Sequence, residues 1–100
     1  MIGVCVLGGG LVGRFVATTL FERGYKIRLV DSDSSAFTNI PIEIECAHTR
    51  IDLEKGLEKI VGNCKIVVNC LPGRIGHLVR APLLSIDGLS VADLAFTAED

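Results

Sequence analysis

A glycine-rich segment near the N-terminus carries the clearest chemical signal in this sequence. Residues 8–13 read GGGLVG, which fits the pattern G-x-G-x-x-G. The pattern directly follows an apolar run typical of a buried strand and opens a helical pattern, which is the context that a dinucleotide-binding turn requires. We expect Gly8 to permit the tight turn, Gly10 to let the backbone approach a pyrophosphate, and Gly13 to let helix and strand pack closely.

The start of the predicted helix would supply the positive side of such a site. Backbone N–H groups near Leu11 and Val12 would face the anion along the positive end of the helix dipole. The alternative interpretation is a glycine turn that serves packing alone.

Asp31 is the second candidate binding residue. It ends the second apolar run, 18 residues after Gly13 and 23 after Gly8, close to the spacing of an acid that accepts hydrogen bonds from an adenosine ribose. A carboxylate there repels a 2′-phosphate, and residues 32–49 contain no Arg or Lys to neutralise one. This favours NAD over NADP as the cofactor. The alternative role for Asp31 is a solvated carboxylate or a cap of the following turn.

A third group of candidates follows the most strand-like segment of the chain. The stretch NCLPG places Asn69, Cys70, Leu71, Pro72 and Gly73 at the carboxyl end of the fourth predicted strand. In a doubly wound sheet the first and fourth strands flank the crevice that binds the ligand, so this turn would lie beside a ribose or nicotinamide. A plain turn that ends the strand is the alternative.

Weaker candidates are found at the end of the third predicted strand and among the histidines. By the same geometry Cys46 and Ala47 would border an adenine pocket. His48 and His77 have no Cys or acid at ligand spacing, so no metal site is predicted, and the four cysteines are expected to be reduced structural thiols. The residues point to no catalytic group.

These candidates need a fold that brings strand ends together. Apolar strand patterns cover residues 2–7, 26–31, 42–46, 65–71 and 89–95. Helical patterns begin at Leu11 and stop at Gly24, recur at Leu53, Leu57, Ile60 and Val61 before Gly62, and recur again at Ile75, Leu78 and Val79. Strands that alternate with helices predict an α/β fold with a doubly wound parallel sheet of about five strands, a three-layer Rossmann-like domain over residues 1–100.

Two connections and two strands carry more specific expectations. Residues 32–41 are too few for a full helix, so a single turn is predicted there. Pro82 must end, kink or restart the last helix. The strand over residues 42–46 alternates and should lie near a sheet edge, whereas the strand over residues 89–95 should form an open edge through which the chain self-associates.

Composition excludes several classes of partner. The chain is 49% apolar and carries a formal net charge of −2, with no cluster of Lys or Arg. We therefore expect binding neither to nucleic acid nor to a membrane surface. No apolar run approaches the length of a membrane span, and the short apolar start lacks the basic region of a signal peptide, so a cytoplasmic location is expected.

Three segments together resemble a known family. VLGGGLVGRFVA, VVNCLPGRIGHLV and VADLAFTAED are similar to the N-terminal domain of the saccharopine dehydrogenase family, and within it to the lysine dehydrogenases. The resemblance implies an oxidoreductase that acts on an amino acid with a nicotinamide cofactor. It would place the pyrophosphate on Gly8, Gly10, Leu11 and Val12, the adenosine ribose on Asp31 and Ser32, and the nicotinamide end near Leu71, Pro72 and Gly73.

The sequence departs from that family in three respects. The region after Asp31 is short, Pro82 interrupts a helix, and the second domain, which in the family supplies the substrate contacts and the dimer interface, is absent from these residues. A rival interpretation is a nucleotide-sensing regulatory domain like those of potassium transport systems. A short-chain dehydrogenase is disfavoured, because Tyr25 is the only tyrosine and no Tyr-x-x-x-Lys pair exists.

Overall fold

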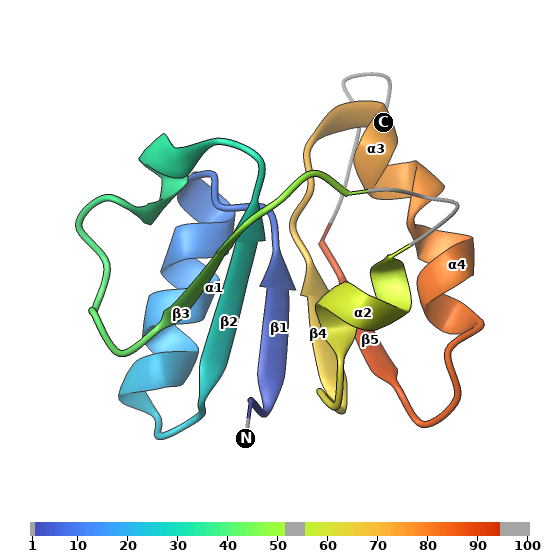
Figure 1. Cartoon of the computed structure of the whole chain (residues 1–100), viewed down its shortest axis with the longest axis horizontal. Coiled ribbons are helices and arrows are strands. Elements are labelled where there is room, and N and C mark those ends of the chain that lie inside the picture. The colour runs from blue at the N-terminus through green and yellow to red at the C-terminus, as the bar shows by residue number, and fades with distance from the viewer. Residues whose placement is uncertain (1, 52–55, 95–100) are drawn as a thin grey trace.

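The computed structural model describes residues 2–51 and 56–94 as strands that alternate with helices (Figure 1). In chain order the elements are β1 (Val4–Leu7), α1 (Leu11–Glu22), β2 (Ile27–Asp31), the 3-10 turn η1 (Ser34–Phe37), β3 (Glu45–His48), α2 (Leu57–Val61), β4 (Ile66–Asn69), α3 (Gly73–Leu78), α4 (Arg80–Leu84) and β5 (Ser90–Asp93). Within these two stretches of chain, no helix has the length and apolar character needed to cross a membrane.

The five strands form one parallel sheet in the order β3-β2-β1-β4-β5. After β1 the chain builds the sheet in one direction through β2 and β3, and then returns to place β4 on the other side of β1. The carboxyl ends of all five strands therefore lie on the same side of the sheet, and the strand order reverses between β1 and β4. The predicted α/β, doubly wound, Rossmann-like fold is confirmed, with five strands.

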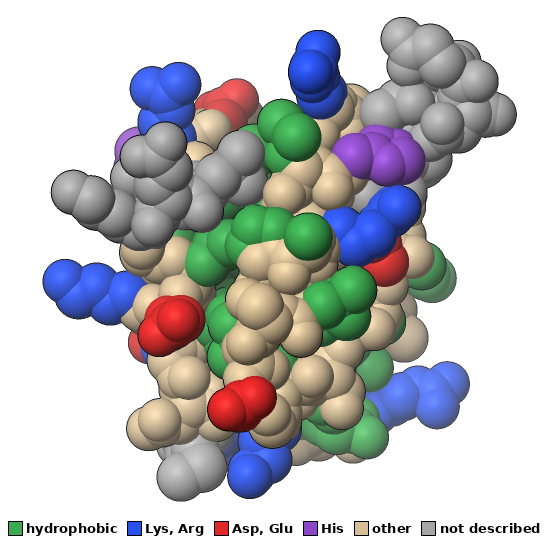
Figure 2. All heavy atoms as spheres, turned by 90° about the vertical axis from the view of Figure 1, so that its right-hand side faces the viewer, with side chains coloured by type: hydrophobic (Ala, Val, Ile, Leu, Met, Phe, Trp, Pro, Cys, Tyr) green, Lys and Arg blue, Asp and Glu red, His purple; other side chains and the backbone are tan. Residues whose placement is uncertain are grey.

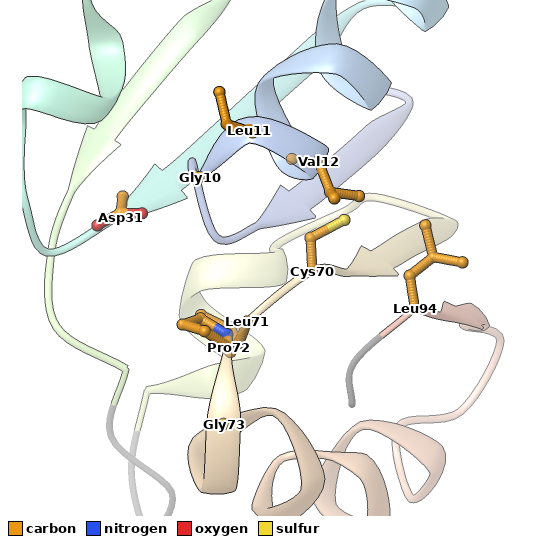
Figure 3. A pocket seen from close by; sticks show the side chains of 10 residues that line it. Gly10, Leu11, Val12, Asp31, Cys70, Leu71, Pro72, Gly73 and Leu94 are labelled. Carbon is orange, nitrogen blue, oxygen red and sulfur yellow. The ribbon is translucent and has the colours of Figure 1, made fainter. Parts of the chain in front are cut away.

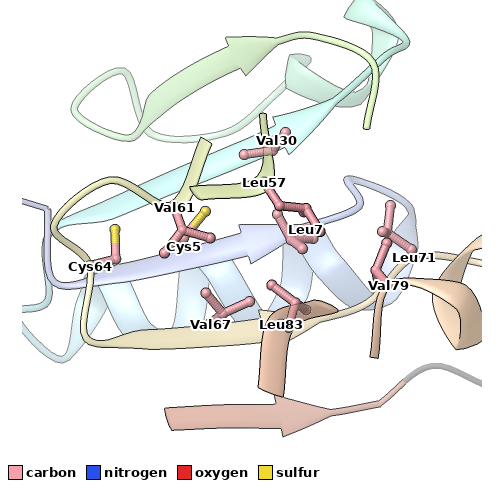
Figure 4. Packing of buried hydrophobic residues seen from close by; sticks show 10 residues of the cluster. All are labelled: Cys5, Leu7, Val30, Leu57, Val61, Cys64, Val67, Leu71, Val79 and Leu83. Carbon is pink, nitrogen blue, oxygen red and sulfur yellow. The ribbon is translucent and has the colours of Figure 1, made fainter. Parts of the chain in front are cut away.

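Apolar layers cover both faces of the sheet, because neighbouring residues of a strand point to opposite faces. Val4 and Val6 of β1 pack with Ala17 of α1 on one face. Cys5 and Leu7 pack on the other face with residues of α2 and α4 (Figure 4). Every residue of β1 is buried, as expected for a central parallel strand with helices on both sides.

The connections agree with most of the local signals. A single 3-10 turn, η1, replaces a helix between β2 and β3. The predicted apolar stripe appears in α2, where Leu57 and Val61 are buried and Gly62 ends the helix, while Leu53 lies outside the described residues. Pro82 lies in the first turn of α4, where its missing N–H has no helical acceptor to lose.

The strand predicted over residues 42–46 is wrong in position. Residues 41–44 form a turn in which the Ile44 N–H donates to the Pro41 carbonyl at 3.1 Å, and β3 begins only at Glu45. Ile44 is buried whereas Ile42 is 94% exposed, so the apolar alternation arises from a turn with one residue in the core. The predicted location of β3 at a sheet edge is confirmed.

The opposite edge of the sheet is formed by β5, as predicted. The Ser90 and Leu94 N–H groups donate towards β4, at 2.8 and 2.9 Å, so by alternation the Val91 N–H points away from β4. Leu84 is 66% exposed and Leu94 48% exposed near this edge. Figure 2 faces this side of the molecule and shows apolar side chains in the open, with charged side chains around them. Self-association through β5 stays a prediction.

We expect Ala92→Lys to weaken this self-association. Ala92 is an exposed residue of β5, and a lysine on an edge strand hinders pairing with a second edge. Ile42→Lys, which adds the same charge in the exposed turn before β3, is the matched control and should change nothing. Sedimentation velocity at several protein concentrations measures the effect. A wild-type chain that is monomeric at every concentration would contradict the prediction.

Candidate functional site

A cavity of about 580 Å³ opens at the carboxyl ends of the strands, where the strand order reverses (Figure 3). This volume falls within the range of small-molecule binding pockets. Segments far apart in the sequence meet there: the start of α1, the end of β2, the loop after β4 and the residue after β5. Its lining residues are Gly10, Leu11, Val12, Gly13, Asp31, Cys70, Leu71, Pro72, Gly73 and Leu94.

Close packing leaves no room for a side chain at Gly8, in the turn between β1 and α1, or at Gly13, in the first turn of α1. Gly8 has φ of +95°, and a Cβ atom there would lie 2.7 Å from the Cys70 carbonyl oxygen. A Cβ atom at Gly13 would lie 1.7 Å from the Gly8 carbonyl oxygen. The positive φ of Gly8 permits the tight turn, and Gly13 lets the start of α1 pack closely against the end of β1, which are the roles predicted for these two glycines. The turn also lies close to the end of β4.

Gly10, unlike Gly13, has open space around its α-carbon. Gly10 is exposed, and a Cβ atom built on it would have no other atom within 4 Å. It is the N-cap of α1, and no side chain caps this helix start. The first helical hydrogen bond runs from the Arg14 N–H to the Gly10 carbonyl at 2.9 Å, so the N–H groups of Leu11 and Val12 precede the helical bonding pattern. The site therefore offers backbone donors and room for an anion.

The Asp31 carboxylate is fixed in place by the backbone. One of its oxygens accepts from the Gly9 N–H at 2.6 Å and the other from the Asp33 N–H at 2.8 Å. These contacts couple the end of β2 to the glycine-rich turn. Each carboxylate oxygen can accept more than one hydrogen bond, so Asp31 keeps capacity for a ligand's hydroxyl groups.

The loop between β4 and α3 forms an apolar wall opposite the start of α1 (Figure 3). Leu71 and Pro72 lie on it, and Leu94 faces the cavity from the end of β5. Burial, and secondarily the charge of Asp93, raises the pKa of the Cys70 thiol to about 11. Cys70 is therefore a neutral, weakly polar part of this wall at neutral pH.

Four of the predicted residues do not line the cavity: Gly8, Ser32, Cys46 and Ala47. Gly8 lies behind the lining, close to the Cys70 carbonyl. Ser32 is exposed beyond Asp31, and its carbonyl accepts from Nε2 of His48 at 2.9 Å. Cys46 and Ala47 lie inside β3 rather than at its end, because β3 continues to His48. The residue at the carboxyl end of β3, level with Asp31, is therefore His48 and not the predicted pair.

Leu94 lines the cavity without having been predicted to do so, and Asn69, the first residue of the predicted NCLPG segment, lies beneath the cavity wall. The Leu94 N–H donates to the Asn69 carbonyl at 2.9 Å. This hydrogen bond continues the pairing with β4 one residue beyond β5, so that Leu94 lies at the carboxyl ends of the strands and lines the cavity. Asn69 is fully buried beneath the loop. A lone polar residue that ends a continuous apolar run was the available signal for Asn69.

Sequence comparison adds nothing to these observations. No family model and no curated protein matches the chain, so its resemblance to the saccharopine dehydrogenase family stays a prediction that rests on its motifs.

Proposed function

We propose that this chain binds NAD in the cavity at the strand ends and acts as the cofactor domain of an NAD-dependent oxidoreductase. The observation that carries the proposal is the meeting of three groups in one cavity: the open helix start at Gly10, the fixed carboxylate of Asp31, and the apolar wall after β4. An amino-acid substrate is the further expectation that the family resemblance supports.

Each part of the cavity suits one part of a dinucleotide. The N–H groups of Leu11 and Val12 would donate to the pyrophosphate, helped by the positive end of the helix dipole. Asp31 would accept from the ribose hydroxyls of the adenosine half. The loop of Leu71 and Pro72 would hold the nicotinamide half against an apolar surface. Bound NAD would supply the hydride chemistry, and these residues would bind and orient it.

The ionisable groups of the cavity favour binding over catalysis by the described residues. Among the residues that line it, only Asp31 and Cys70 carry ionisable side chains. Asp31 is held by two backbone N–H groups, and the raised pKa of Cys70 leaves its thiol protonated at neutral pH. A proton acceptor for a substrate would therefore come from residues outside this cavity wall.

Asp31 should make the chain prefer NAD over NADP. A 2′-phosphate next to the fixed carboxylate is a like-charge contact, which costs several kcal/mol. Asp31→Asn removes the repulsion, so the ratio of the NADP and NAD dissociation constants should fall towards one. Some weakening of both cofactors is expected, because an asparagine has only one oxygen for the Gly9 and Asp33 N–H groups.

Calorimetric titration with both cofactors tests the proposal and the role of Asp31. Asp87→Asn is the matched control: it removes the same charge at an exposed position between α4 and β5, and it should leave the ratio unchanged. A folded wild-type chain that binds neither cofactor at millimolar concentration would refute the proposed function. Equal binding of both cofactors would refute the role of Asp31 alone.

A further inference from the structure

Asn69 is a polar residue where the core alone would favour an apolar one. It ends β4, follows the buried residues Val67 and Val68, and has no exposed surface. Burial of a side-chain amide costs free energy unless its N–H and C=O groups are hydrogen-bonded. The hydrogen bonds of this side chain therefore indicate what the residue does.

The Asn69 side chain is hydrogen-bonded to segments around the loop after β4. Its Nδ2 donates to the Gly76 carbonyl in α3 at 2.8 Å and more weakly to Asp93 Oδ1 at 3.4 Å. Its Oδ1 accepts from the Leu71 N–H at 3.2 Å. One amide thus fixes both sides of the turn that carries Leu71, Pro72 and Gly73 into the cavity.

The network continues to the end of β5. Asp93, which pairs with Asn69 in the sheet, also accepts a hydrogen bond from Arg80 Nε at the start of α4. Leu94, which lines the cavity, follows Asp93 directly. Asn69 therefore lies at the centre of a group of contacts that shapes one wall of the cavity, whereas the Asp31 wall is held by other bonds.

We infer that Asn69 is a positioning residue that holds the β4–α3 loop in the conformation that receives the nicotinamide half of the cofactor. This inference rests on the proposed function. It separates the cavity into two independently supported walls, one built on Asp31 for the adenosine half and one built on Asn69 for the nicotinamide half. A change at Asn69 should therefore affect NAD and leave AMP, which lacks the nicotinamide half, unaffected.

Asn69→Asp tests the inference in the full chain. It keeps the shape and the acceptor for the Leu71 N–H, but it places an oxygen against the Gly76 carbonyl and the Asp93 carboxylate. Calorimetry should show NAD binding weakened about tenfold or more, the loss expected from one disrupted buried hydrogen bond. The dissociation constant of AMP should stay the same. Asn63→Asp, the same exchange at an exposed position before β4, is the matched control.

Asp93→Asn provides a second variant in case Asn69→Asp does not fold. Asp93 lies on the outer side of the same network, and its variant should weaken NAD binding in the same selective way, by a smaller factor. If a folded variant weakens NAD and AMP equally, or weakens neither, the inference is overturned while the proposed function stands. A wild-type chain that binds neither NAD nor AMP would overturn the proposed function itself.

Discussion

Gly13→Val should leave the chain largely unfolded at room temperature. Even the first side-chain atom would lie 1.7 Å from the Gly8 carbonyl oxygen, so two backbone segments would have to separate. Gly8 cannot yield easily, because its N–H donates to the Val30 carbonyl at 2.8 Å and its α-carbon lies against Cys70. Overpacking that side chains can absorb costs about 1–3 kcal/mol. A displaced backbone should cost more, about 4 kcal/mol or above, which is much of a small domain's stability.

Circular dichroism with thermal and urea denaturation measures this effect. Gly10→Val is the control in the same loop, since the space around Gly10 is open. Its thermal midpoint should fall by only a few degrees, as about 1 kcal/mol does in a domain of this size. Similar losses of stability in the two variants would show that the glycines do not divide their roles as described.

The sequence predicted the elements of the sheet well because burial on two faces leaves an unmistakable pattern. β1 is continuously apolar, β4 is apolar up to its last residue, Asn69, and the glycines that flank α1 fix where that helix begins and ends. The prediction failed at β3, in which three of the four residues are exposed and none is fully buried. The position of β3 is set by backbone pairing with β2, which does not depend on side-chain type. The buried Ile44 before β3 produced an apolar alternation that resembles a strand pattern.

The parts of the candidate site that depend on local backbone conformation could be predicted from the sequence. The parts that depend on contacts between distant segments could not. The spacing of Gly8, Gly10 and Gly13 is typical of a tight turn that leads from a strand into a helix. The spacing between this turn and Asp31 is typical of an acid at the end of the second strand. The contribution of Leu94 depends on where β5 lies relative to β4, and that of Asn69 on three segments brought together by folding. Neither relation is encoded in local sequence.

Gly10→Val should abolish NAD binding in a chain that remains folded. A valine there would have room in the free protein, but it would project from the N-cap of α1, in front of the N–H groups of Leu11 and Val12. The pyrophosphate would lose those charge-assisted hydrogen bonds, each worth about 1.5–3 kcal/mol. Loss of two of them corresponds to a dissociation constant raised at least about a hundredfold.

Titration of NAD into Gly10→Val, alongside its thermal midpoint, separates binding from folding. Gly3→Val is the matched control, because Gly3 also has room for a Cβ atom, 3.8 Å from the Lys26 carbonyl oxygen. Gly3 precedes β1 and so lies at the amino ends of the strands, away from the cavity. It should bind NAD as the wild type does. NAD binding that survives in Gly10→Val would mean that the anion does not approach the start of α1. In that case the glycine-rich turn would serve only to pack the helix against the sheet.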